Sequence, residues 1–117
     1  MSVALQPLAL VVEDDYFQRS ALADLLRGQN FSVIDCDCVE AADLVLAKTG
    51  LELTLLVTDV DLGPGRDGLE LAAFALKTFP SMRVVIVSGQ NHFSIPDGAV
   101  FLQKLVLRRD MAALSLT

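Results

Sequence analysis

Apolar runs of strand length alternate with segments of helical period along almost the whole chain. The runs are LALVV (8–12), FSVIDC (31–36), LTLLVT (53–58), RVVIVS (83–88) and AVFLQ (99–103). Between and after them, apolar residues recur every three or four positions in the segments 16–27, 40–48, 69–79 and 106–116. Strands that are apolar on both faces and alternate with helices predict an α/β fold, a doubly wound sheet of five parallel strands with helices on both faces.

Capping and helix-breaking residues mark where the predicted helices begin and end. Asp15 with Gln18, and Asp67 with Glu70, have the spacing of capping boxes, while Gly28 and Pro80 are placed to end helices. The residues expected to face the sheet are Phe17, Ala21, Leu22, Leu25 and Leu26 in the first helix, and Ala41, Leu44 and Val45 in the second.

Composition and charge narrow the functional classes. A chain of 117 residues that is 53% hydrophobic is expected to form one compact domain over residues 1–117. Its net charge of −6 argues against direct binding to nucleic acid or to an anionic membrane. With no apolar run long enough to span a membrane and no basic secretory start, a cytoplasmic location is expected. Cys36 and Cys38 are interpreted as packing residues, because alternate strand residues point to opposite faces.

Acidic residues follow two of the predicted strands. Glu13 and Asp14 end the first apolar run, and Asp59 and Asp61 end the third. Ligands of parallel α/β sheets bind at the carboxyl ends of the strands, so these carboxylates are expected to share one edge. Their mutual repulsion is tolerable if a cation lies among them, and oxygen ligands favour Mg²⁺, Ca²⁺ or Mn²⁺ over Zn²⁺. Asp15 and Asp67, by contrast, are interpreted as helix caps, a position where aspartate is common.

Four stretches, in this order, resemble the receiver domains of bacterial two-component response regulators, of which the chemotaxis receiver is the single-domain example. They are VVEDD (11–15), TDVDLGPGRDGLEL (58–71), VSG (87–89) and FLQK (101–104). The resemblance covers nearly the whole chain and implies a flavodoxin-like sheet of strand order 2-1-3-4-5. Its specificity comes from the ordered set, since no single motif is sufficient.

The resemblance assigns roles at the acidic edge. It implies that Asp59 accepts a phosphoryl group and that Glu13, Asp14 and Asp59 bind Mg²⁺, with Mn²⁺ as an alternative ion. The backbone carbonyl of Asp61 would be a further metal ligand. An ionised aspartate can attack phosphorus in line, and positive charge around the transferred group removes the repulsion that would oppose the attack.

Three further residues match the catalytic and switch positions of the family. Lys104 corresponds to the lysine that neutralises phosphoryl oxygens, Ser88 to the hydroxyl that binds the new phosphoryl group, and Phe101 to the aromatic residue that turns when the state changes. The implied donor is a histidine kinase or a histidine phosphotransfer protein. The implied output is altered binding to a downstream protein, with a homodimer as a further option.

The chain departs from the family pattern in three places. Gly68 follows Asp59 by nine positions, one more than is common, and LGPG replaces the usual hydrophobic-proline pair. The segment GQNHFSIPDG (89–98) is short and contains Pro96, so the fourth helix is expected to be short or absent. Leu105 replaces the usual proline after Lys104, which predicts a trans peptide bond there and a lysine aimed somewhat differently.

Two other functions remain open at this point. A receiver that is never phosphorylated and acts as a binding module would explain the altered fourth-helix region. A haloacid dehalogenase-like phosphatase would use Asp59 and Asp61 as a DxD pair, but that family carries the pair on its first core strand. The preferred hypothesis is a signalling switch, with only its own phosphorylation and slow dephosphorylation as catalysis. The chain would be a single-domain regulator or a piece of a longer regulator or hybrid kinase.

Overall fold

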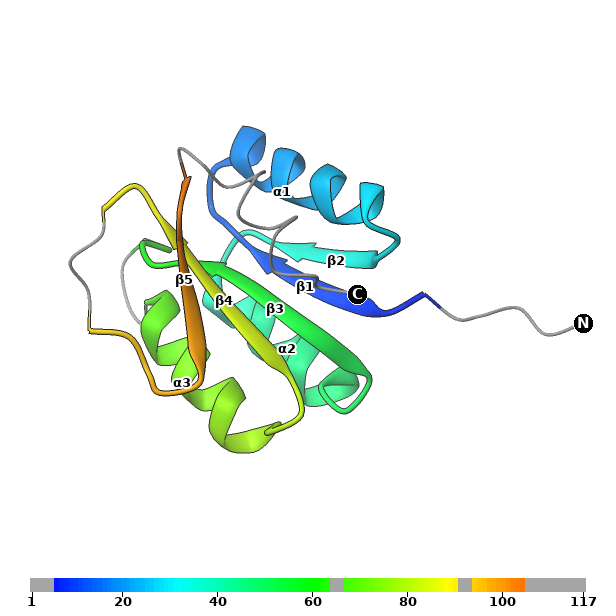
Figure 1. Cartoon of the computed structure of the whole chain (residues 1–117), viewed down its shortest axis with the longest axis vertical. Helices are drawn as coiled ribbons and strands as arrows, with labels where there is room; N and C mark the ends of the chain where they lie inside the picture. The colour runs from blue at the N-terminus through cyan, green and yellow to red at the C-terminus, as the bar shows by residue number, and fades with distance from the viewer. Residues whose placement is uncertain (1–5, 64–66, 91–93, 105–117) are drawn as a thin grey trace, which may run out of the picture.

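The computed structural model describes residues 6–63, 67–90 and 94–104. In chain order its elements are β1 (Leu8–Val12), α1 (Tyr16–Gly28), β2 (Ser32–Cys36), α2 (Val39–Thr49), β3 (Leu53–Asp59), α3 (Gly68–Thr78), β4 (Arg83–Ser88) and β5 (Ala99–Gln103). The strands form one parallel sheet in the order β2-β1-β3-β4-β5. This order and the strand–helix alternation confirm the predicted fold (Figure 1).

Helices cover both faces of the sheet, as the unbroken apolar strands require. On one face, α2 and α3 pack over Leu10, Val12, Leu56 and Ile86. On the other, α1 packs over Ala9, Val11, Leu55 and Val57 (Figure 1). Consecutive residues of one strand therefore contribute to opposite cores, which explains why the central strands carry no alternating polar positions.

The register of the sheet aligns the carboxyl ends of its strands. Val12 at the end of β1 pairs with Cys36 of β2 and with Thr58 of β3. Asp59 of β3 pairs with Val87 of β4, and Ser88 pairs with Gln103 of β5. The last residue of β3 and the residues that directly follow β1 and β5 are consequently at the same edge of the sheet.

The helix faces were predicted only in part. In α1 the buried residues are Leu22, Ala23 and Leu26, whereas Phe17 is 80% exposed and Ala21 is exposed. The prediction for Phe17 was wrong because the first turn of α1 lies at the carboxyl edge, beyond the strands that could cover it. In α2 the buried stripe is Val39, Ala42 and Leu46, with Leu44 exposed, so this helix has more apolar residues than one stripe can bury.

The segment between β4 and β5 contains no helix in residues 89–90 and 94–98, in agreement with the expectation that the fourth helix is short or absent. Gly98 in this segment has a positive φ of 94°, a conformation that glycine adopts readily. The predicted last helix (106–116) and the bond from Lys104 to Leu105 lie outside the described residues. Among the helices described, none has the length and apolarity to cross a bilayer.

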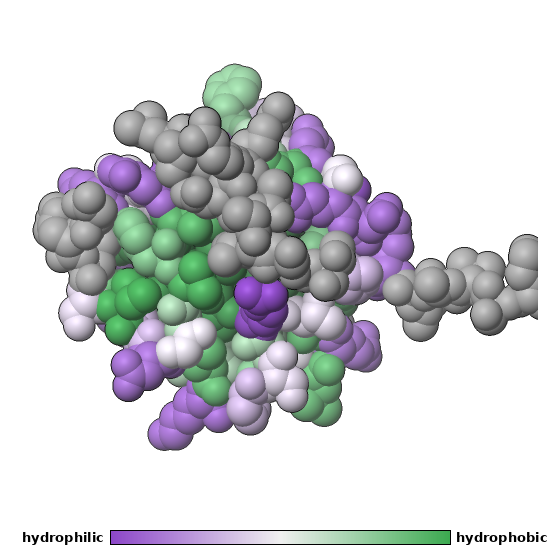
Figure 2. Space-filling model, in the orientation of Figure 1, coloured by the Kyte–Doolittle hydropathy of each residue, from purple (hydrophilic) through white to green (hydrophobic). Residues whose placement is uncertain are grey.

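β5 is an edge strand, and its outer part is less covered than the centre of the sheet. Apolar surface is visible in the region of β5 (Figure 2). Ala99 and Phe101 are only partly buried there and pack against the core that α3 also covers. Cys36 is buried in that same core, which confirms its interpretation as a packing residue.

Candidate functional site

Three carboxylates meet at the carboxyl edge of the sheet. Oxygen atoms of Glu13, Asp14 and Asp59 lie within 4.8 Å of one another. Glu13 is fully buried, Asp59 is 7% exposed, and Asp14 is exposed. The expectation that carboxylates from two separate strand ends gather at one place is therefore confirmed.

Both backbone polar groups of Glu13 are hydrogen-bonded. Its N–H donates to the carbonyl of Cys36 at 3.0 Å, which extends the pairing of β1 with β2 by one residue. Its carbonyl accepts a hydrogen bond of 2.9 Å from Arg19 Nη1, and the Arg19 guanidinium also lies 5.6 Å from the ring centre of Tyr16. The Glu13 carboxylate accepts from the N–H of Asp15 at 3.3 Å. These contacts hold the side chain in the direction of the cluster.

Asp59 is positioned by close backbone packing. Its carbonyl accepts a hydrogen bond of 2.9 Å from Thr58 Oγ1, and Gly68 at the start of α3 approaches that carbonyl closely. A Cβ atom on Gly68 would lie only 1.7 Å from the Asp59 oxygen, so this position excludes every side chain. Gly68 N–H also donates to the carbonyl of Val60 at 2.8 Å. The glycine thus lets α3 begin directly beside the acidic strand end.

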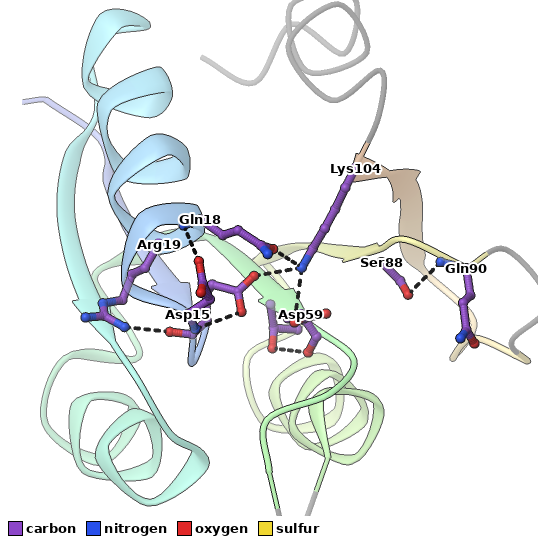
Figure 3. A network of polar contacts seen from close by, with 9 residues as sticks. Asp15, Gln18, Arg19, Asp59, Ser88, Gln90 and Lys104 are labelled. Carbon is purple, nitrogen blue, oxygen red and sulfur yellow. Dashed lines mark hydrogen bonds and ion pairs between the residues drawn. The ribbon is translucent and has the colours of Figure 1, made fainter.

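Lys104 reaches the cluster from the end of β5 (Figure 3). Its Nζ lies 2.8 Å from Glu13 Oε1 and 3.2 Å from Asp59 Oδ2, and it also contacts Gln18 Oε1. The side chain of Asp59 is 10% exposed and that of Lys104 is 25% exposed. The amine therefore compensates part of the negative charge, while a small opening to solvent remains at Asp59.

Burial and charge perturb the pKa values of both partners. Burial raises the pKa of Glu13 from 4.5 to about 7, opposed by the hydrogen bond from Lys104 and reinforced by the charge of Asp59. Burial alone would lower the pKa of Lys104, but its hydrogen bond to Glu13 and the charge of Asp59 raise it above its ordinary value. One ammonium therefore does not neutralise the cluster, and its oxygen donors fit a hard divalent cation such as Mg²⁺.

The remaining predicted residues lie around this centre. The Asp61 side chain is exposed and is not among the three clustered carboxylates, which leaves its backbone carbonyl as the predicted ligand atom. Ser88 is 5% exposed, and its Oγ accepts a hydrogen bond of 3.1 Å from Gln90 N–H. Phe101 pairs in register with Ile86 and is partly buried on the α3 face of the sheet. The sites of Ser88 and Phe101 are thus joined through neighbouring strands.

Two curated proteins of Pseudomonas aeruginosa are similar to this chain in sequence. The response regulator protein FleR is 37% identical over 81 residues, which are 68% of this chain and 16% of FleR. The transcriptional regulatory protein AruR is 30% identical over 92 residues, 76% of this chain and 37% of AruR. A receiver domain protein (CheY-like) from Methanospirillum hungatei superposes with a TM-score of 0.77 and 26% identity, covering 94% of this chain and 90% of that one.

The chain is a receiver domain of the response regulator type. The fold agrees with a further solved structure, a response regulator from Burkholderia pseudomallei described with a phosphorylated aspartic acid, a calcium ion and citrate. That structure has a TM-score of 0.76 and 24% identity, with 95% of this chain and 66% of that one covered. No family model matches the sequence. The receiver domain spans well under half the length of each curated relative.

One residue of this receiver domain was missed as a site residue. Gln18 was interpreted only as part of a capping box, and its N–H does donate to Asp15 Oδ2 at 2.9 Å. Its side chain does not close the box, because the N–H of Asp15 is bound by Glu13 and the Gln18 amide oxygen contacts Lys104. The signal was available in its position, since Gln18 lies in the first turn of the helix that begins directly after Glu13 and Asp14.

A second surface feature lies far from this site. A cavity of about 640 Å³ is formed between the last turns of α2 and α3, with Leu46, Leu51, Phe74 and Phe79 among its lining residues. These helix ends lead into β3 and β4, so the cavity lies at the amino edge of the strands. It is therefore separate from the acidic edge, where the titratable groups with perturbed pKa values gather.

Proposed function

We propose that this receiver domain accepts a phosphoryl group on Asp59 and thereby changes its affinity for a partner protein. The observation that supports the proposal is the grouping of Asp59 with two further carboxylates, Glu13 and Asp14, and with the ammonium of Lys104, which contacts both Asp59 and Glu13. A buried carboxylate with clustered acids and a lysine within contact distance has what an aspartyl nucleophile needs. The proposed domain comprises residues 1–117, alone or as a piece of a longer protein.

The proposed reaction is an in-line displacement at phosphorus. An ionised oxygen of Asp59 forms a bond to phosphorus while the bond from phosphorus to the imidazole nitrogen of a phosphohistidine breaks, and the imidazole takes up a proton as it leaves. Lys104 neutralises part of the charge on the transferred oxygens, which would otherwise repel the carboxylate. Water later cleaves the acyl phosphate. This slow self-dephosphorylation is the only further catalysis proposed for the domain.

Glu13, Asp14 and Asp59, with the carbonyl of Asp61, are the proposed ligands of Mg²⁺, and Mn²⁺ has the same preference for oxygen. When bound, the ion supplies positive charge that compensates the phosphoryl oxygens. The raised pKa of Glu13 supports this assignment, because a buried carboxylate that is not fully compensated gains most from a cation. The calcium ion and phosphorylated aspartic acid described for the Burkholderia protein are consistent with the same chemistry.

Ser88 and Phe101 are proposed to transmit the change. The Ser88 hydroxyl would donate to a phosphoryl oxygen and draw its loop toward Asp59, which would let Phe101 repack against Ile86. The proposed donors are a histidine kinase or a histidine phosphotransfer protein in the cytoplasm. The altered surface would be recognised by a downstream protein or by a second copy of the chain.

Incubation of the purified chain with MgCl₂ and acetyl phosphate tests the proposal. Intact-protein mass spectrometry should show the mass of one added phosphoryl group, and Asp59→Asn should abolish it. Asp61→Asn is the matched control, because its side chain lies outside the cluster and should leave phosphorylation intact. Persistent absence of the added mass, with the cation bound, would favour a binding module that acts without phosphorylation.

A further inference from the structure

The ammonium of Lys104 has as many acceptors as it has protons. It carries three N–H groups, and it contacts the oxygens of Glu13, Asp59 and Gln18. Figure 3 shows Lys104 directed between the carboxylates on one side and the Gln18 amide on the other. The lysine is therefore shared between two charged acceptors and one neutral acceptor.

Two of these acceptors are also proposed ligands of the divalent cation. Glu13 and Asp59 belong to the carboxylate cluster that fits a divalent cation, so the ammonium and the cation would compete for the same oxygens. The ammonium and a bound cation would also repel each other, because both are positively charged. Among the three acceptors of Lys104, the amide oxygen of Gln18 alone lies outside the carboxylate cluster.

The place of Gln18 is fixed by the start of α1. Its backbone N–H is held by the carboxylate of Asp15 at 2.9 Å, which anchors the first turn of the helix. Its side chain is left available for Lys104, because Glu13 binds the Asp15 N–H that a closed capping box would use. A neutral acceptor at this point can hold the ammonium near Asp59 without adding charge to an acidic cluster.

We infer that Gln18 is a positioning residue that raises the cation affinity of the site by giving Lys104 an acceptor outside the carboxylate cluster. This inference rests on the proposed function, since it assumes that the cluster binds a divalent cation. It goes further by assigning the balance between lysine and cation to a residue of α1 that is not itself a proposed metal ligand. Without Gln18, the ammonium falls back on Glu13 and Asp59 and competes more strongly with the cation.

A double-mutant cycle on the metal-free full chain tests this coupling. The Kd for MgCl₂ and for MnCl₂ is measured by calorimetry for wild type, Gln18→Leu, Lys104→Met and the double variant. Gln18→Leu should weaken cation binding roughly threefold to tenfold, the range that corresponds to the net contribution of one ordinary hydrogen bond. In the Lys104→Met background the same substitution should leave Kd unchanged.

Two more variants separate positioning from general effects. Gln18→Glu keeps an acceptor for Lys104, so its affinity for the cation should be at least that of wild type. Gln6→Leu is the matched control. Gln6 precedes β1 and accepts a hydrogen bond from Ser32 at the start of β2, so it lies at the opposite edge of the sheet. It should leave the Kd unchanged, and a comparable loss of affinity in this control would overturn the inference.

The two hypotheses fail in different ways. If wild type binds no divalent cation, the proposed function fails and the inference fails with it. If wild type binds the cation but Gln18→Leu has an unchanged Kd, or weakens binding equally with and without Lys104, only the role of Gln18 is overturned.

Discussion

Lys104 Nζ lies 2.8 Å from Glu13 Oε1, although the two residues are 91 positions apart in the chain. In the sheet, β3 and β4 lie between β5, which precedes Lys104, and β1, which precedes Glu13. The lysine side chain thus reaches along the carboxyl edge, and its Nζ also lies 3.2 Å from Asp59 Oδ2. This ion pair joins the two halves of the fold at the point where chemistry is proposed.

Removal of the lysine charge should separate phosphoryl transfer from cation binding. Lys104→Met should slow phosphorylation by acetyl phosphate roughly 100-fold or more, the loss typical when one charge-stabilising donor is removed. The same variant should bind Mg²⁺ more tightly, because the competing ammonium is gone. Quench-flow mass spectrometry measures the first effect and calorimetry the second. Lys48→Met, at an exposed position of α2, is the control. Equal rates for Lys104→Met and wild type would contradict the assigned role.

The raised pKa of Glu13 predicts a pH dependence of stability. Between about pH 4.5 and about pH 7 the folded chain retains a proton that the unfolded chain has released. The free energy of unfolding should therefore decrease as pH rises through this window, by roughly 2–3 kcal/mol from this group. Urea unfolding without divalent cations, at about pH 5 and about pH 7.5, measures it. The difference should be smaller in Glu13→Gln; an identical pH profile in that variant would refute the assignment.

The close approach of Gly68 to Asp59 predicts a large effect of one methyl group. Gly68→Ala places a Cβ where the Asp59 carbonyl lies, so the start of α3 must move. We expect a loss of stability of roughly 1–3 kcal/mol and slower phosphorylation. Gly28→Ala is the matched control, since nothing lies within 4 Å of its added Cβ, and it should be neutral or slightly stabilising. Similar thermal unfolding of both variants would show that the contact is not restrictive.

The hydrogen bond at Ser88 predicts that phosphorylation of Asp59 can be separated from the conformational response of Phe101. Ser88→Ala should still accept a phosphoryl group on Asp59, because the nucleophile and its charged neighbours are unchanged. The loop containing Gln90 should no longer respond, since Ser88 Oγ now links that loop to the strand end. Aromatic NMR signals of Phe101, recorded before and after acetyl phosphate, are the measurement. A wild-type response of Phe101 in Ser88→Ala would exclude the hydroxyl as the link.

Local sequence patterns predicted the elements but not all of their faces. The five strands and first three helices follow from continuous apolar runs, helical periodicity and the caps at Asp15 and Asp67, all of which act over a few residues. Phe17 and Leu44 were misassigned because periodicity shows which residues could be buried together, but not which of them the sheet covers. Phe17 lies beyond the ends of the strands, and α2 has more apolar residues than its buried stripe can hold.

Sequence patterns were enough to predict that a carboxylate follows β1, that another ends β3 and that Lys104 follows β5. They also predict that these ends share an edge, because parallel strands of one sheet bring their carboxyl ends together. Which atoms meet at that edge depends on contacts between elements that are distant in the chain. The contact of Gln18 with Lys104 and the approach of Gly68 to Asp59 depend on how α1 and α3 are seated on the sheet. Helix placement is set by packing across the whole core, which no short pattern encodes.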